Sequence, residues 1–365
     1  MLESKKRELQ MVAGDLSGLY GMEDITYNEG KAKGMRAINV RNGGGLAATL
    51  LPDRCLDIPY FSYKGVNLGL VTKTGLSGPQ HFVEDGQRGF LKQFNGGLLT
   101  TCGLQTAGAA CEFEGREYGL HGQIHNIPGT DVNKCEFAEG DEIVLQVSAV
   151  MREACVFAEY LELRRVIQVE TERNIIRIID TVKNLGFARA PLVNLYHINF
   201  GFPLINEGTH MYFSADKVAP RDDIAERSFD KYNIVEKAEI GRPEECYIHT
   251  GGGGTQFGML HNSELGLAVV VHYDAGELPL FCEWKCMMAG DYAVGLEPSV
   301  AGFWGIRRAV EDGLARYLEP GEEQSFHLRV EVLDEKDELV SWVNQDSHNT
   351  IAAYAAKCKE NLTLI

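Results

Sequence analysis

Short apolar runs separated by turn-forming residues dominate the chain from about residue 35 onward. Examples are MRAINV (35–40), GLAATLLP (45–52) and DEIVLQVSAV (141–150), and the chain has 40 glycines to supply turns. Runs of this length that are bounded by Gly, Asn, Asp or Pro are typical of β-strands. No strand-like run alternates with a helical run of ten or more residues, so the pattern predicts an all-β fold and disfavours a doubly wound parallel sheet.

Two pairs of neighbouring runs predict β-hairpins. Residues 159–170 and 174–184 are joined by the turn sequence TERN, and residues 254–260 and 265–273 are joined by HNSE. Connections this short place consecutive strands side by side and antiparallel. We therefore expect a large antiparallel sandwich.

The two ends of the chain have a different pattern. Residues 3–13 carry Leu9 and Val12 among charges at helical spacing, and after Val332 the stretch NTIAAYAAKCKENL (349–362) has Ala, Leu and Lys at helical spacing. Length alone would suit two domains, but no linker or internal repeat divides the chain. We predict an N-terminal extension (1–34) that packs on the sandwich, one β domain (35–332) and a C-terminal helical segment (333–365).

The charge and the absence of long apolar stretches limit the classes of partner. A net charge of −17, from 52 acidic and 35 basic residues, repels both phosphodiester backbones and anionic lipids. The amino terminus lacks the apolar run of a signal peptide, and no stretch reaches the ~18 apolar residues of a membrane span. We expect a cytoplasmic protein that binds neither nucleic acid nor membranes. Its nine scattered cysteines are expected to be reduced thiols.

The first candidate site segment is YGLHGQIHN (118–126), where His121 and His125 lie four positions apart beside glycine. Such imidazoles are easily presented to a ligand. They can equally well hydrogen-bond the backbone of their own loop, and the sequence leaves both interpretations open.

The second segment is NLYHINFGFP (194–203). If it forms a strand, His197 and Asn199 share one face while Tyr196 and Ile198 lie on the other. A polar face at a ligand is one interpretation, and a buried histidine beside a buried amide is the other.

The third segment is YAVGLEPS (292–299), with Glu297 directly before a proline. The proline is expected to end the strand and leave the carboxylate at a rim, where the alternative is a simply solvated glutamate. Upstream, Trp284 suits stacking on a sugar face and Lys285 suits a hydroxyl or an anion. Trp284 suits core packing as well.

In this order, the segments GREYGLHG (115–122), NLYHINFG (194–201) and GLEP (295–298) give the chain a resemblance to the galactose mutarotase (aldose 1-epimerase) superfamily. The resemblance spans residues 35–332. It implies a β supersandwich that binds a small-molecule carbohydrate in an open cleft on a concave face.

The resemblance also implies residue roles. Glu297 would be the general base that takes the proton of the anomeric hydroxyl, and His197 the general acid that protonates the ring oxygen. His121 would be a second hydrogen-bonding group near that oxygen. The ring opens, the aldehyde end rotates, and closure on the other face gives the other anomer. Such acid–base chemistry requires no metal, nucleotide or covalent intermediate, so no cofactor is expected.

The chain departs from the family pattern in one place. Better-known members carry an arginine and an asparagine before the His-Gly segment, whereas FNGGLLTTCG (94–103) contains no arginine. The nearest substitutes are Arg88, Lys92 and Gln93, among which the sequence does not choose. We predict substrate contacts from Arg88, Gln93, His125, Asn199, Trp284 and Lys285.

Three functional hypotheses follow. The first is 1-epimerisation of a free aldose or a close derivative by Glu297 and His197. The second is another sugar isomerisation, assisted by a metal that His121, His125, His197 and Glu297 would hold. The third is a non-catalytic carbohydrate-binding protein. The sequence leaves open which sugar binds and whether the chain forms a homodimer.

Overall fold

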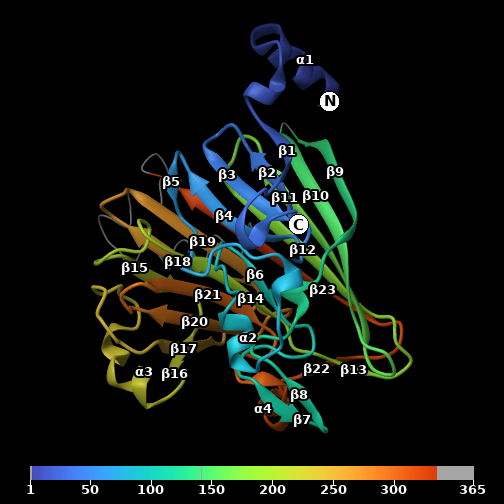
Figure 1. Cartoon of the computed structure of the whole chain (residues 1–365). Coiled ribbons are helices and arrows are strands. Elements are labelled where there is room, and N and C mark those ends of the chain that lie inside the picture. Colours follow the sequence, from blue (N-terminus) through green and yellow to red (C-terminus); the bar gives the residue numbers. More distant parts are fainter. Residues whose placement is uncertain (1, 141, 335–365) are drawn as a thin grey trace.

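The computed structural model describes residues 2–140 and 142–334 of the chain, and most of them lie in antiparallel strands. This confirms the predicted all-β class. The helices expected in 333–365 fall almost entirely outside the described residues, and Leu333 itself ends the last strand. Figure 1 shows the arrangement of the strands and the few short helices.

Two large sheets make up the body of the protein. The eight-stranded sheet has, in spatial order, β15 (His210–Phe213), β18 (Thr255–Asn262), β19 (Leu267–Asp274), β23 (Glu323–Leu333), β12 (Ile175–Asn184), β11 (Tyr160–Glu170), β10 (Glu142–Ala154) and β9 (Thr130–Glu139). The six-stranded sheet has β16 (Lys217–Pro220), β17 (Glu245–Thr250), β20 (Leu280–Cys286), β21 (Ala293–Ser299), β14 (Leu195–Phe200) and β6 (Thr100–Cys102).

Smaller elements complete the fold. A five-stranded sheet has β1 (Gly21–Thr26), β2 (Arg36–Arg41), β3 (Leu46–Leu51), β4 (Asp57–Tyr63) and β5 (Val66–Asn67), and two strand pairs join β7 (Cys111–Phe113) to β8 (Arg116–Tyr118) and β13 (Ala190–Leu192) to β22 (Arg316–Leu318). The α-helices are α1 (Leu2–Ala13), α2 (Gln87–Leu91), α3 (Asp223–Arg227) and α4 (Gly305–Glu311).

Both predicted hairpins are present. β11 pairs antiparallel with β12, from Leu161 opposite Asn184 to Val169 opposite Ile176. β18 pairs antiparallel with β19 through the HNSE turn, from Thr255 opposite Asp274 to Asn262 opposite Leu267. The turn chemistry and the apolar runs were therefore sufficient to predict these pairings.

The six-stranded sheet packs one face of β14 against the eight-stranded sheet. The ring of Tyr196 lies 6.2 Å from that of Phe326 of β23, and the Tyr196 hydroxyl donates to Asp180 of β12 at 2.8 Å. Because side chains alternate along a strand, His197 is turned to the opposite face. Inward packing of Tyr196 thus fixes the direction of the adjacent histidine.

A buried ionic cluster joins the sheets behind β14. The fully buried Arg165 of β11 donates two hydrogen bonds to Asp180, at 2.6 and 2.8 Å, and one each to Asp57 of β4 at 2.9 Å and Thr101 of β6 at 2.7 Å. Burial raises the pKa of Asp57 to about 6, although Arg165 and Thr101 oppose that effect. The cluster makes β14 part of a rigid frame.

The amino-terminal helix α1 stands at one end of the molecule (Figure 1). It has no buried residue, and Lys5 and Lys6 pair with Glu172 and Glu136. The helix predicted over residues 3–13 is confirmed by these bounds. In the part of the chain that the structure describes, no helix has the length and apolar character needed to cross a bilayer, and the eight described cysteines are all unpaired thiols.

Candidate active site

A cavity of about 840 Å³ opens on the face of the six-stranded sheet that is turned away from the eight-stranded one. The loop between β5 and α2, the helix α2, the loop after β8 and the strands β14, β17, β20 and β21 all contribute to its lining. Four of the predicted site residues line it: His121, His197, Trp284 and Glu297. Segments that are distant in sequence thus meet in one pocket of the size typical of small-molecule sites.

His197 and Glu297 form the centre of the cavity floor. They come from the adjacent strands β14 and β21, and His197 Nδ1 lies 3.0 Å from Glu297 Oε1. The contact is short, but its angle falls outside hydrogen-bond geometry, and neither atom has a hydrogen-bond partner among the described residues. Buried polar atoms are rarely left unpaired, and where they are, the site commonly receives a ligand or a proton.

The environment of Glu297 differs from the predicted strand-end rim. β21 continues through Pro298 to Ser299, and Glu297 is only 2% exposed, so the predicted position at a rim is wrong, and so is the alternative of a simply solvated glutamate. The β14–β21 register pairs Leu195 with Ser299 and then Ile198 with Leu296, skipping the two residues between them on each strand. A proline without an N–H is tolerated inside the strand because it falls in that gap.

Gly295 leaves room for the carboxylate of Glu297. A Cβ atom at this position would lie 2.3 Å from Glu297 Oε1 and 3.2 Å from Trp284 Cβ. Any larger residue would displace one of these two cavity side chains. The glycine in the GLEP segment is therefore a steric requirement of the site.

The loop that follows β8 presents His121 to the cavity in a constrained geometry. His121 has a φ of 61° and accepts a hydrogen bond at Nδ1 from the Gly108 N–H at 3.2 Å. At Gly122, whose φ is 70°, a Cβ would lie 2.3 Å from the Gly103 oxygen. Because Nδ1 of the neutral imidazole accepts, the ring proton resides on Nε2, and His121 can act as a hydrogen-bond donor.

Burial moves the pKa values of all three groups towards their neutral forms. Burial raises the pKa of Glu297 well above its usual range, and the Glu244 carboxylate raises it further while Arg221 opposes the shift. Burial lowers the pKa of His197 to about 4, and burial with the nearby His197 and His125 lowers that of His121 well below its usual range. Burial is the largest cause of both shifts, because it penalises the charged form of each group.

Aromatic rings enclose the two cavity histidines. The ring of Phe94 lies 5.1 Å from that of His197, the ring of Phe90 lies 4.7 Å from that of His121, and Trp284 meets His197 edge-on at 5.3 Å. These contacts hold the imidazoles in place. Trp284 thus lines the cavity, where the sequence had left core packing as an alternative.

Among the cavity residues that were missed at the sequence level are Arg221 and Glu244. Arg221 directly follows β16 and Glu244 directly precedes β17, and their side chains pair at 3.0 Å. Glu244 also accepts the Trp284 indole N–H at 2.8 Å. Neither residue belongs to a recognisable motif or spacing. The one sequence signal that could have predicted them is that each is a charged residue directly beside a strand end. Arg221 places an arginine in the cavity from a segment unrelated to residues 94–103.

Four predicted contacts do not line the cavity. Arg88 is exposed on α2. Gln93 is buried, and its backbone carbonyl accepts a hydrogen bond from Arg54. The His125 ring meets the Asn126 amide at 2.8 Å beneath the loop. The Asn199 amide donates to the His197 carbonyl at 2.7 Å, which stiffens β14 although the side chain shares the predicted face.

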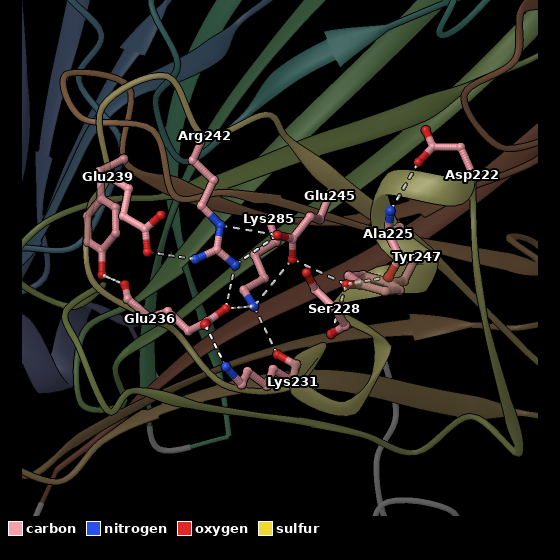
Figure 2. A network of polar contacts seen from close by, with 11 residues as sticks. Asp222, Ala225, Ser228, Lys231, Glu236, Glu239, Arg242, Glu245, Tyr247 and Lys285 are labelled. Atoms are coloured by element: carbon pink, nitrogen blue, oxygen red, sulfur yellow. Dashed lines mark hydrogen bonds and ion pairs between the residues drawn. The ribbon is translucent and has the colours of Figure 1, made fainter.

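Lys285 also lies outside the cavity lining, on the opposite face of β20 from Trp284. Its fully buried ammonium group contacts Glu236 at 3.1 Å and Glu245 at 3.6 Å and donates to the Lys231 carbonyl at 2.9 Å. Figure 2 shows this group between the two glutamates, with Arg242 bridging them from the other side. Burial alone would raise the pKa of Glu236, but the donors from Arg242 and Lys285 lower it to about 2.

This ionic network lies directly behind the cavity wall. Glu245 follows the cavity residue Glu244, and Lys285 follows the cavity residue Trp284. The two strands pair with Glu245 opposite Lys285 and Cys246 opposite Trp284. The network therefore fixes the register that presents Trp284 and Glu244 to the cavity.

The four residues considered as metal ligands do not converge. His125 lies outside the cavity that holds His121, His197 and Glu297. Residues 2–140 and 142–334 contain no group of three or more His, Cys, Asp or Glu side chains placed to hold a metal ion. The donor geometry thus does not fit the metal-assisted alternative.

Solved structures with the same fold include mutarotase-like proteins. A provisionally named aldose 1-epimerase from Klebsiella pneumoniae subsp. pneumoniae superposes with a TM-score of 0.83 at 19% identity, covering 95% of this chain and 91% of its own. A galactose mutarotase-like protein from Clostridium acetobutylicum gives 0.61 at 15% identity, covering 87% and 99%. Galactose 1-epimerase from Lactobacillus acidophilus gives 0.56 at 13% identity, covering 86% and 99%.

The fold is accordingly that of the galactose mutarotase-like proteins, as the resemblance implied. Within that class the family model described as "Domain of unknown function (DUF4432)" matches residues 32–332, and the chain belongs to that family. No curated protein sequence matches the chain.

Proposed function

We propose that this protein is a cofactor-independent aldose 1-epimerase that interconverts the anomers of a reducing sugar. The observation that carries the proposal is the pair of buried atoms His197 Nδ1 and Glu297 Oε1, 3.0 Å apart on a cavity floor and without hydrogen-bond partners among the described residues. A buried acid–base pair that faces a small-molecule cavity is suited to moving protons on a bound ligand. The mutarotase-like fold supports the same assignment.

The pair suits the two proton transfers that ring opening requires. The anomeric oxygen and the ring oxygen are bonded to the same carbon, so the base and the acid must be neighbours and need not lie on opposite sides of the sugar. Both pKa shifts favour the state in which the pair holds one proton with no net charge. The two atoms are 3.0 Å apart, and a small reorientation on substrate binding that aligns them lets the proton move to the imidazole, which creates the carboxylate base and the imidazolium acid.

The reaction then proceeds on the substrate. Glu297 takes the proton of the anomeric hydroxyl as His197 gives one to the ring oxygen, and the bond between C1 and the ring oxygen breaks to form the open-chain aldehyde. Rotation about C1–C2 and closure reverse both transfers and yield the other anomer. His121, which carries its proton on Nε2, donates a hydrogen bond to the ring oxygen. Arg221 and Glu244 receive sugar hydroxyls at the cavity wall.

The test is anomer exchange, followed by NMR after a pure anomer is dissolved. Glu297→Gln keeps the shape of the side chain but removes the base, and we expect the catalysed rate to fall by about 10²–10⁴-fold. Glu311→Gln, on the exposed end of α4, is the matched control and should retain full activity. Undiminished exchange in a folded Glu297→Gln protein would overturn the role of Glu297, and the absence of exchange for wild type with every sugar would favour a binding protein.

A further inference from the structure

The cavity is larger than a single sugar residue. Its volume is about 840 Å³. A hexose has about twelve heavy atoms, which fill less than about 360 Å³ even at the roughly 30 Å³ that a water molecule takes in the liquid. More than half of the cavity would remain empty around a monosaccharide held by His197 and Glu297.

The cavity has an exposed apolar rim. Val71, Leu91 and Phe202 all line the cavity, and they are 51%, 53% and 65% exposed. They come from three separate segments: the loop after β5, the end of α2 and the turn after β14. Exposed apolar side chains gathered from different segments around one opening mark a binding surface more often than chance exposure does.

The rim lies at a distance from the acid–base pair. Phe202 follows His197 by five residues along and just beyond β14, so at about 3.3 Å per residue the two are separated by up to roughly 16 Å. A separation near that limit exceeds the span of one sugar ring. The backbone of the turn is held in place, because the Asn67 amide donates to the carbonyls of both Phe202 and Gly69 at 2.8 Å.

Polar groups lie among the apolar ones in this part of the lining. Asn67, Gln87 and Thr72 line the cavity together with Phe202, and Lys73 pairs with Asp291 at 2.6 Å at the same opening. A sugar ring presents both C–H surface, which packs on aromatic and aliphatic side chains, and hydroxyls, which need polar partners. The mixture fits a second sugar residue better than a purely apolar substituent.

We propose that the substrate is a reducing oligosaccharide of two or more residues, with its reducing residue at His121, His197 and Glu297 and its next residue on the rim formed by Val71, Leu91 and Phe202. This inference rests on the proposed 1-epimerase function and specifies its substrate class. The reacting anomeric centre stays free, since the second residue is attached through another hydroxyl of the reducing sugar.

Matched pairs of sugars test the inference. Anomer exchange is measured by NMR for glucose beside maltose and cellobiose, xylose beside xylobiose, and mannose beside mannobiose. We expect kcat/KM for at least one disaccharide to exceed that of its own monosaccharide at least about fivefold. In Phe202→Ala we expect the ratio of disaccharide to monosaccharide efficiency to fall about fivefold, which is the effect of losing one aromatic contact.

Two controls keep the outcome interpretable. Phe187→Ala removes a fully exposed phenylalanine that does not line the cavity, and it should leave the ratio unchanged. Leu91→Ala probes the rim from a different segment and should act in the same direction as Phe202→Ala. A monosaccharide preference in every pair, or a ratio that Phe202→Ala does not move, would overturn the inference while the epimerase function stands.

Failure of the proposed function has a different signature. If wild type accelerates no exchange, the same disaccharides are tested for binding by saturation-transfer NMR with wild type and Phe202→Ala. Disaccharide binding that weakens in Phe202→Ala supports the rim site in a protein that is not an epimerase. Absence of disaccharide binding overturns both.

Discussion

Glu297 and His197 are buried together, and each changes what the other can do. Burial favours the neutral form of each group, so the pair retains a single proton over a wide pH range. The rings of Phe94 and Trp284 pack on the imidazole of His197 and hold it beside Glu297. A histidine of ordinary pKa in open solvent would exchange its proton with water instead.

The pH dependence of activity follows from this shared proton. Below the pKa of His197, about 4, a second proton enters and no base remains; above the raised pKa of Glu297 the last proton leaves and no acid remains. We therefore expect the acid limb of kcat/KM to lie near pH 4 and not near pH 6.5, where an ordinary histidine titrates. An acid limb near pH 6.5 in the measured profile would contradict this arrangement.

The alkaline limb can be moved separately. Glu244 is a negative neighbour that raises the pKa of Glu297, so Glu244→Gln should shift the alkaline limb of the pH–rate profile to lower pH. The change also weakens the contact with Arg221 and so raises KM. Glu311→Gln serves as the control that leaves both limbs in place. A KM effect with no shift of the limb would show that Glu244 only binds substrate.

At the scale of elements, β20 has two differently specialised faces. Trp284 faces the cavity, whereas Glu283 and Lys285 face the buried ionic groups behind it. The pairing of Lys285 with Glu236 and Glu245 keeps β17 and β20 in register and so determines where Trp284 points (Figure 2). The wall of the site therefore depends on residues that never touch the cavity.

Removal of the buried ammonium group should destabilise this wall. In Lys285→Met two glutamates lose a partner inside the protein, and we expect the free energy of unfolding to drop by roughly 3 kcal/mol. Lys231→Met removes an exposed lysine paired with the same Glu236 and should cost less than about 1 kcal/mol. Urea unfolding of both variants provides the comparison. Equal losses would mean that the network contributes no more than a surface ion pair.

At the scale of the whole molecule, the two parts of the N-terminal segment are attached to the sheets to different degrees. α1 has no buried residue and is tied down through Lys5 and Lys6. β1, by contrast, pairs with β2 over six residue pairs, from Gly21 opposite Arg41 to Thr26 opposite Arg36. The predicted extension 1–34 thus contains both a peripheral helix and an integral strand.

Two truncations separate these parts. Deletion of residues 2–13 should lower Tm by less than about 4 °C, because little apolar surface leaves the core. Deletion of residues 2–34 removes β1 and leaves β2 as an unpaired edge, so we expect a larger loss of Tm together with self-association. Thermal scanning and size-exclusion chromatography measure both effects. If the two truncated proteins have the same Tm and the same oligomeric state, residues 14–34 contribute no more to the fold than α1 does, and the β domain begins after residue 34.

The sequence by itself determined the local features of this protein. The apolar runs and short turns predicted the β class and both hairpins, and alternation along β14 predicted that His197 lies on the face opposite Tyr196. These features depend on residues near one another along the chain, so a local pattern contains them. The prediction that the strand ends at Pro298 was wrong. The gap in the β14–β21 register that accommodates this proline depends on both strands, so the sequence of one strand does not reveal it.

Only the tertiary structure decided which side chains share the cavity. Arg221 and Glu244 reach it beside Trp284 and Glu297, whereas Lys285 is turned to the opposite face of its strand, although no local signal distinguishes these charged residues. Tertiary packing also set the pKa values, since the shifts of His197 and Glu297 arise from burial by distant segments. The burial of a side chain and its meeting with other side chains depend on residues that are far apart in sequence, so both exist only in the folded chain.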